Sequence, residues 1–269
     1  MRLFVFDIDG TLLPRGKMNI SPIDIESISK LLKNGDAVVI ASGRPYCSIR
    51  YLIDLFVDSP NKYLIGANGA ASYNMDGSFI NQNGLTLSDL YHFYDEYKDT
   101  EVITYGYDTK SGLVIYEESP CTKIETLLCG IPKERFTFVP KEGKPADLEI
   151  PLLKVILGAA PEVSKNIKFT KEELETYTIN RSDPCYIEIL HKGSDKGFQV
   201  ENLRKHLGIK KEDVYCFGDA GNDLTMIRDN HGIAMGNASP DVKEVAEFVT
   251  TPCDEQGVTY ALKHYGFID

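Results

Sequence analysis

The sequence predicts an α/β fold with a doubly wound parallel sheet as its core, and three observations support this prediction. Short continuous apolar runs recur along the chain, as at residues 3–6 and 37–41, and such runs are typical of strands buried on both faces. Segments with helical apolar periodicity separate these runs. Polar residues and glycines follow where the runs end, and this is the edge at which open α/β sheets bind ligands.

Composition and charge narrow the class of protein. The chain has 269 residues, enough for one large or two ordinary domains. Its 42% of hydrophobic and 26% of charged residues are ordinary for a globular protein. The formal net charge of −11 argues against binding to nucleic acid, because phosphate contacts require a basic face.

The sequence contains no pattern that predicts a membrane or exported protein. The apolar run at residues 3–6 is too short for a signal-peptide core, and no stretch approaches 18 consecutive apolar residues. The six cysteines are scattered and form no Cys-x-x-Cys pair, as expected of free thiols in a reducing compartment. We therefore expect a cytoplasmic protein without membrane partners.

The first 82 residues alternate between strands and helices. Ser21 and Pro22 predict a helix start, with Asp24 completing a capping box. Gly35 predicts the end of this helix, and Pro45 opens a second one. The strands expected around these helices lie at residues 3–6, 37–41 and 63–66, and a hairpin turn is expected at 74–77.

The middle of the chain has a different texture, since tyrosines become dense from about residue 83. A mixture of antiparallel strands and helices is expected there. The strands are expected at 102–107, 113–118, 152–158 and 186–190, and the helices near 87–97 and 170–177. This mixture predicts an α+β domain at 83–187, inserted into a core that consists of residues 1–82 and 188–269.

The last part of the chain returns to the α/β alternation. A strand at residues 214–217 ends in Gly218 and Asp219, and a further short strand is expected at 232–236. The closing helices are expected at 241–248 and 256–265.

Two acids follow the first apolar run. Side chains at positions i and i+2 of an extended segment point the same way, so the carboxylates of Asp7 and Asp9 are expected to lie together at the sheet edge. Carboxylates that close repel each other, and the repulsion favours a divalent cation or a proton between them. An ordinary turn at Asp9 and Gly10 explains the same residues.

Three further polar motifs stand at strand or loop ends, and each of them alone is explained by a turn or a helix cap. The complete set is Asp7-x-Asp9-Gly10-Thr11, Ser42-Gly43-Arg44, Lys196 and Gly218-Asp219-x-x-Asn222-Asp223. In identity, order and spacing this set resembles the haloacid dehalogenase (HAD) superfamily of phosphohydrolases. The insertion is similar to the large cap domain of the Cof-type, sugar-phosphatase-like branch. The resemblance covers essentially the whole chain and implies a Rossmann-like core with an inserted cap.

The resemblance implies a phosphoryl-transfer reaction with a carboxylate nucleophile. Asp7 corresponds to the nucleophile that forms an aspartyl-phosphate. Asp9 corresponds to the general acid for the leaving oxygen and then to the base for the hydrolytic water. A repulsive neighbour and partial burial could raise the pKa of Asp9 for this purpose. Lys196 would neutralise the transferring phosphoryl group.

The resemblance also implies a metal and a phosphate site. Mg²⁺ is the expected cofactor, with the side chains of Asp7 and Asp219 and the backbone carbonyl of Asp9 as ligands. Asp223 would be either a further ligand or a partner of a ligand. Phosphate oxygens would be held by Ser42, the Gly43 amide, Lys196 and Asn222. Asn68 fits the phosphate-side loop, although turn chemistry explains it equally well. Arg44 is close enough in sequence to reach the substrate, but a surface salt bridge is the favoured explanation.

The expected function is a Mg²⁺-dependent phosphatase that acts on a small phosphorylated metabolite, most plausibly a sugar phosphate. Two alternatives remain open from the sequence. A phosphomutase or phosphotransferase of the phosphomannomutase-like type would share the aspartyl-phosphate and a similar cap. A non-catalytic sensor of a phosphorylated metabolite would keep the fold, but the presence of both Asp7 and Asp9 argues against it.

Overall fold

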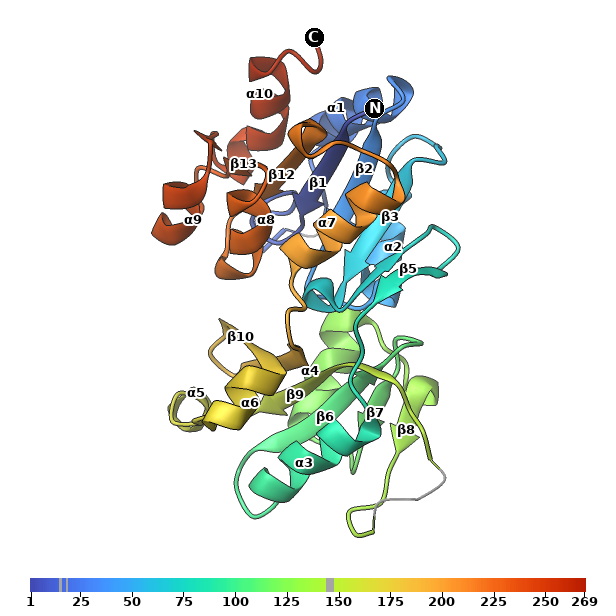
Figure 1. Cartoon of the computed structure of the whole chain (residues 1–269), viewed down its shortest axis with the longest axis vertical. Helices are drawn as coiled ribbons and strands as arrows, with labels where there is room; N and C mark the ends of the chain where they lie inside the picture. The colour runs from blue at the N-terminus through green and yellow to red at the C-terminus, as the bar shows by residue number, and fades with distance from the viewer. Residues whose placement is uncertain (15, 18, 144–147) are drawn as a thin grey trace. The chain divides into compact units, whose positions relative to one another are not determined.

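The computed structural model describes residues 1–14, 16–17, 19–143 and 148–269. The chain forms two compact units (Figure 1): one consists of Met1–Asn81 and Asp195–Asp269, and the other is Gln82–Ser194. We call them the core unit and the inserted unit. The end predicted for the insertion, residue 187, lies within strand β11, Tyr186–His191, which pairs with two strands of the inserted unit.

The core unit contains an eight-stranded sheet with the order β14-β13-β12-β1-β2-β3-β4-β5. The first six strands in this order are parallel, and β4 runs antiparallel to β3. Because β1 lies between β12 and β2, three polar loops meet at one edge of the sheet. The strands are β1 Leu3–Asp7, β2 Ala37–Ala41, β3 Lys62–Gly66, β4 Ala71–Tyr73, β5 Phe79–Gln82, β12 Val214–Gly218, β13 His231–Ala234 and β14 Phe248–Val249.

Helices cover both faces of this sheet, which confirms the predicted doubly wound fold. Leu3 and Val5 of β1 face an apolar cluster that includes residues of α7, α8 and α9. Phe4 points to the other face, where its ring packs edge-on against Phe267, after α10, with centroids 5.0 Å apart. The helices are α1 Pro22–Lys33, α2 Tyr46–Ile53, α7 Lys196–His206, α8 Leu224–Arg228, α9 Pro240–Val245 and α10 Gly257–His264.

Two local predictions in the core unit are wrong. Ser21 caps α1 as expected, but Asp24 does not complete a capping box. Its buried carboxylate accepts hydrogen bonds from the amide and hydroxyl of Thr259, at 3.1 and 2.6 Å, and so joins α1 to α10. The helix expected at 241–248 ends at Val245, because Phe248–Val249 pairs with β13 as the last strand of the sheet.

The inserted unit is an α+β domain, as predicted, with a six-stranded sheet in the order β10-β11-β9-β6-β7-β8. The pairs are antiparallel except β7 with β8. The strands are β6 Ile103–Asp108, β7 Leu113–Ile115, β8 Phe136–Phe138, β9 Leu152–Gly158, β10 Tyr177–Asp183 and β11. The helices are α3 Leu87–Tyr97, α4 Pro120–Cys129, α5 Pro161–Ser164 and α6 Lys171–Thr176. Helix α4 was not predicted.

The two faces of the inserted sheet differ in chemistry. On one face Val155 and Leu157 belong to an apolar core with residues of α3. On the other, the buried ammonium of Lys154 pairs with Glu188 and lies 4.7 Å from the centroid of the Tyr107 ring. The hydroxyl of that tyrosine donates to Glu125 of α4. Helix α4 therefore belongs to a buried polar network rather than to the apolar core.

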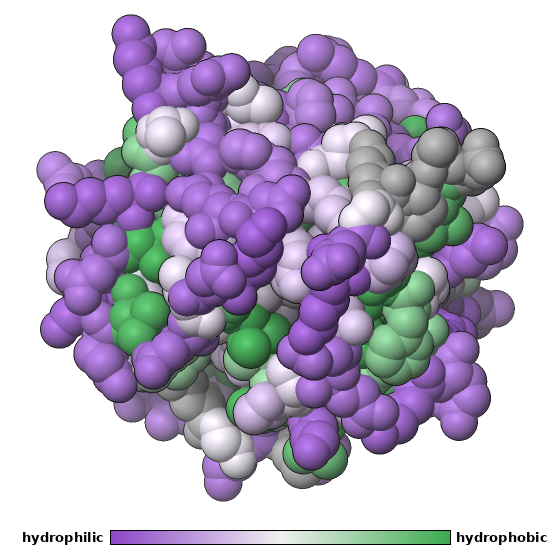
Figure 2. All heavy atoms as spheres, turned by 90° about the horizontal axis from the view of Figure 1, so that it is seen from below, coloured by the Kyte–Doolittle hydropathy of each residue, from purple (hydrophilic) through white to green (hydrophobic). Residues whose placement is uncertain are grey.

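Within the described residues, no helix is both long and apolar enough to span a bilayer. The face shown in Figure 2 is mostly hydrophilic, with apolar side chains in small separate patches, as is usual for protein surfaces. The six cysteines all lie in the described ranges, and no two of them are joined by a disulfide there.

Candidate active site

The centre of the candidate site is a buried ion cluster in the core unit. Asp7 is the last residue of β1, Lys196 is the first of α7, and Asp223 immediately precedes α8. The Lys196 ammonium donates to Asp7 Oδ1 and to Asp223 Oδ1, both at 2.6 Å. The exposed fractions of these three residues are only 6%, 0% and 0%, so the structure brings together three charged residues that are distant in the sequence.

Asp219 completes the cluster from the loop after β12. Asp7, Asp219 and Asp223 each place a carboxylate oxygen within 4.8 Å of the other two. The amides of Asp219 and Ala220 donate to Asp223 Oδ2 at 3.0 and 3.1 Å, which fixes this loop. Gly10 has a φ of +95°, and a Cβ at this position would lie 2.2 Å from Asp219 Oδ2. Glycine is therefore required where the first loop approaches the third carboxylate.

The electrostatics of the cluster follow from its burial. Burial raises the pKa of Asp7 to about 8, the carboxylates of Asp223 and Asp219 add to this, and Lys196 opposes it. Burial alone would lower the pKa of Lys196, but the carboxylates of Asp223 and Asp7 hold it above its ordinary value. Three carboxylates thus face one ammonium, and the excess negative charge favours a proton or a cation at this position.

The donor set fits a hard divalent cation. Carboxylate oxygens are the ligands that Mg²⁺ prefers in proteins, and the cluster supplies them from the end of β1 and from the segment between β12 and α8, which surrounding hydrogen bonds hold in place. Two negative charges in excess of the lysine match the charge of one divalent ion. The residues present are therefore compatible with the magnesium site that the sequence predicts.

Asp9 has surroundings different from those of Asp7. Strand β1 ends at Asp7, so the alternation that was expected to place both carboxylates together does not extend to Asp9. The Asp9 side chain is 56% exposed and forms a bidentate ion pair with Arg44, whose Nη2 and Nε lie 2.6 and 3.1 Å from its oxygens. The sequence predicts a repulsive, negatively charged neighbour for Asp9. The contact in the structure is instead with the guanidinium of Arg44, which is a cation.

The predicted phosphate-side residues lie on three adjoining loops. Asn222 Nδ2 donates to Asn68 Oδ1 at 2.9 Å, and the Asn68 amide donates to the carbonyl of Ser42 at 3.0 Å. A Cβ on Gly43 would lie 2.9 Å from Asn68 Nδ2. Asn68 has a φ of +53°, which asparagine tolerates better than most residues. The loops after β2, β3 and β12 are thus held together through Asn68.

Comparison with known proteins identifies the family. The family model of the haloacid dehalogenase-like hydrolases matches residues 4–262. The chain belongs to this family. It is 32% identical to YxeH of Bacillus subtilis (strain 168), over 97% of each chain, and 29% identical to the HMP-PP phosphatase of Yersinia enterocolitica, over 98% of this chain and 95% of the other. The solved HAD subclass IIB sugar phosphatase BT4131 superimposes with a TM-score of 0.80 at 25% identity and full coverage of both chains.

These similarities confirm the predicted superfamily and branch, and they establish the class of enzyme. The relatives are named as phosphatases, and the family model covers the chain almost from end to end. This HAD hydrolase is therefore a phosphatase, and a phosphorylated small molecule is its class of substrate.

Asn237 is a residue of this HAD hydrolase that the sequence analysis missed. Its Nδ2 donates to the carbonyl of Gly10 at 2.8 Å, and its Oδ1 accepts from the Cys253 amide at 2.9 Å. The amide side chain therefore joins the loop that follows Asp9 to the loop around Cys253. A Gly-Asn pair directly after a short parallel strand was the available signal, since such positions adjoin the ligand edge of the sheet.

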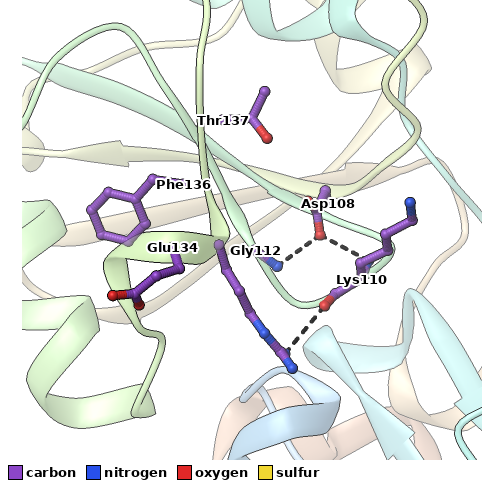
Figure 3. Close-up of a pocket in the computed structure, with 7 residues that line it drawn as sticks. Asp108, Lys110, Gly112, Glu134, Phe136 and Thr137 are labelled. Atoms are coloured by element: carbon purple, nitrogen blue, oxygen red, sulfur yellow. Dashed lines mark hydrogen bonds between the residues drawn. The ribbon is translucent and has the colours of Figure 1, made fainter.

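The inserted unit has a separate hollow of about 390 Å³ that contains none of the predicted site residues. Figure 3 shows Asp108 on one side of it, where the carboxylate accepts from the amides of Gly112 and Lys110, each at 2.7 Å. Glu134, Phe136 and Thr137 line the other side. Because the carboxylate of Asp108 is used to close the turn between β6 and β7, the hollow is explained by the local backbone.

Proposed function

We propose that this phosphatase is a Mg²⁺-dependent phosphomonoesterase that acts through an aspartyl-phosphate on small phosphorylated metabolites, with sugar phosphates as the first class to test. The observation that carries the proposal is the buried cluster in which Lys196 bridges Asp7 and Asp223 at the carboxyl edge of the sheet. Asp219 places a third carboxylate oxygen within 4.8 Å of the oxygens of Asp7 and Asp223. A purely structural ion pair with Lys196 does not need this third carboxylate.

The carboxylates of Asp7, Asp219 and Asp223 would hold the cation, together with the Asp9 carbonyl that the family resemblance implies. When bound, the cation supplies positive charge against the phosphoryl oxygens. Lys196 supplies a second positive charge from within the protein and orients Asp7 through the contact at 2.6 Å. With the cation bound as well, Asp7 would be ionised and fixed in one direction, as an attacking carboxylate must be.

In the first step an oxygen of Asp7 attacks phosphorus, the bond from phosphorus to the ester oxygen breaks, and Asp9 donates its proton to that oxygen. In the second step Asp9 removes a proton from water as the water attacks phosphorus, and the bond to Asp7 breaks to release phosphate. Asp9 must leave its ion pair with Arg44 to carry a proton. Its 56% exposure gives this carboxyl access to protons from solvent.

The remaining predicted residues would bind the transferring phosphoryl group. We propose that the Ser42 hydroxyl, the Gly43 amide and the Asn222 amide side chain donate to its oxygens, as loop amides do at phosphate sites. The loops that carry them are joined by the Asn222–Asn68 and Asn68–Ser42 hydrogen bonds. Preorganised donors of this kind stabilise charge without reorganisation during the reaction.

The test is a panel of phosphorylated metabolites, with sugar phosphates and HMP-PP among them, assayed for phosphate release with Mg²⁺ and with a chelator. The names of the relatives motivate both substrates. We expect Mg²⁺-dependent release of phosphate and its loss in Asp7→Asn. Retention of full p-nitrophenyl phosphate hydrolysis by purified Asp7→Asn would falsify the mechanism. Transfer of the phosphoryl group to another sugar hydroxyl, with no free phosphate, would instead identify a phosphomutase.

A pair of variants separates the roles of two acids. Asp9→Asn is expected to lower kcat by about 100-fold or more while leaving the Mg²⁺ dependence of activity near that of the wild type. Asp219→Ala is expected to raise the Mg²⁺ concentration needed for half-maximal activity first. If Asp9→Asn shifted the Mg²⁺ requirement as much as Asp219→Ala does, the assignment of Asp9 as the proton carrier would be wrong.

A further inference from the structure

A second cluster of metal-ligating side chains lies within the inserted unit, apart from every residue proposed for catalysis. His92 and Glu96 stand four residues apart on α3, so they share one face of that helix. Glu173 reaches them from the first turn of α6. One ring nitrogen and two carboxylate oxygens of these residues all lie within 4.8 Å of one another. The two helices thus converge on one point with three ligand atoms.

Glu173 is held in place by its own helix. Its Oε2 accepts from the amide and hydroxyl of Thr170, at 2.7 and 2.9 Å, in a capping box at the start of α6. Its Oε1 lies 2.9 Å from His92 Nε2. The residue is only 4% exposed, so one carboxylate oxygen is used for anchoring and the other is presented to the histidine. Hydrogen bonds that orient a carboxylate in this way are typical of metal ligands.

The two carboxylates create a local excess of negative charge. Glu96 and Glu173 each place a carboxylate oxygen within 4.8 Å of the other and of a ring nitrogen of His92. Like charges at this separation repel each other, and a shared cation relieves the repulsion.

Space for a further ligand adjoins the cluster. A hollow of about 230 Å³ is lined by His92, Thr170, Glu172, Glu173, Thr176 and Tyr177. It adjoins the contact between His92 and Glu173, since both residues line it. A hollow of this size admits water molecules as additional metal ligands.

We propose that His92, Glu96 and Glu173 form a Zn²⁺ site in the inserted unit, with water as the remaining ligand. An imidazole with two carboxylates suits zinc, whereas Mg²⁺ favours oxygen ligands alone. Two ligands of a tetrahedral zinc ion at 2.0–2.1 Å lie about 3.3 Å apart, so the observed separation of 2.9 Å between Nε2 and Oε1 must open slightly. The His92 side chain is 50% exposed and can move by this amount.

The competing explanation is an ordinary ion pair between His92 and Glu173 that binds no metal. The two explanations differ in the role of Glu96, because an ion pair needs one carboxylate and the zinc site uses both. The substitution Glu96→Gln is therefore the most informative change. It keeps the contact between His92 and Glu173 and removes one proposed ligand.

The experiment is calorimetric titration of the full-length protein with ZnCl₂ in saturating MgCl₂, which keeps the acidic cluster around Asp7 occupied. Wild type, His92→Gln and Glu96→Gln are compared with two matched controls, His191→Gln and Glu175→Gln, which change exposed residues outside the cluster. Loss of an outer partner of a ligand typically costs about 10- to 100-fold in metal affinity, so loss of a ligand should cost at least as much. X-ray absorption of the zinc-loaded wild type should show nitrogen and oxygen ligands without sulfur.

We expect one zinc ion per chain in the wild type and both controls, and a loss of affinity of about 100-fold in His92→Gln and in Glu96→Gln. Equal zinc binding by the wild type and Glu96→Gln would overturn the proposal, as would sulfur ligation or the absence of zinc binding. Thermal unfolding without zinc verifies that the variants fold, since both altered side chains lie on the exposed face of α3.

Discussion

The substitution Lys196→Met gives the most direct test of the electrostatic balance in the acidic cluster. Lys196 is fully buried and contacts Asp7 and Asp223, each at 2.6 Å. At an effective dielectric constant of about 20, each contact is worth ~6 kcal/mol before desolvation. Desolvation offsets most of this energy, and removal of one partner from a buried ion pair costs about 3–5 kcal/mol. We expect the free energy of unfolding to fall by that amount in the metal-free variant.

The assay is urea denaturation at pH 7.5 with a chelator present, with Lys62→Met as the matched control. Lys62 is also buried in the core unit, but its partner Asp58 is fully exposed and 3.8 Å away, so its ion pair contributes at most about 1 kcal/mol. Mg²⁺ should restore part of the stability of Lys196→Met, because it replaces the lost positive charge. A loss below about 1 kcal/mol, or one equal to that of Lys62→Met, would refute the reasoning.

The free energy of unfolding of the metal-free protein is also expected to depend on pH, and Lys196→Met should change this dependence. The pKa of Asp7 is raised by burial to about 8, so between about pH 4 and pH 8 the folded metal-free protein holds a proton that the unfolded chain has released. Its stability must fall as the pH rises through this window. Lys196 opposes the shift, so its removal should extend the fall to higher pH. If stability rose with pH in this window, the conclusion that burial raises the pKa of Asp7 in the folded protein would be wrong.

Three further predictions each concern a single contact in the core unit. Gly10→Ala should abolish Mg²⁺-dependent activity in the phosphatase assay, because its Cβ would lie 2.2 Å from Asp219 Oδ2; near-normal activity would show that this loop can move away. Asp24→Ala should lower the free energy of unfolding by about 1.5–3 kcal/mol in urea denaturation, since a buried carboxylate that accepts two hydrogen bonds is lost. A change below about 0.5 kcal/mol, which is typical of exposed sites, would show that the contact between Asp24 and Thr259 does not stabilise the fold. Arg44→Met should lower kcat by about 10- to 100-fold through loss of the bidentate contact with Asp9, at an unchanged Mg²⁺ requirement; an unchanged kcat would show that other groups position this acid.

The parts of the fold that the sequence predicted well are those in which burial alone decides the structure. Residues 37–41 and 152–158 are continuous apolar or nearly apolar runs, and both form the strands expected of them. Helix α4 was missed because its pattern is misleading: Leu127 is 83% exposed, and the buried side includes the polar Glu125. The Ser119-Pro120 start was a usable signal, since Ser119 forms the capping box of that helix.

The sequence predicted which residues belong to the candidate site, but not which of their side chains contact one another. The motifs named Asp7, Lys196 and Asp223, but their sequence positions do not show that one ammonium contacts both carboxylates across 189 and 27 residues. The ion pair of Arg44 was expected only as a surface salt bridge, and its partner proves to be Asp9. Such pairings depend on strand order and loop geometry, which a local pattern does not contain.

Exposure explains why two acids so close in sequence would perform different chemistry. Asp7 is almost completely buried against Lys196, and a carboxylate with little water around it and a fixed cation beside it is suited to attack phosphorus rather than to exchange protons. Asp9 lies beyond the end of β1 with more than half of its side chain exposed, so protons can reach it from solvent once Arg44 releases it. The end of the strand at Asp7 therefore separates the proposed nucleophile from the proposed proton carrier within three residues of chain.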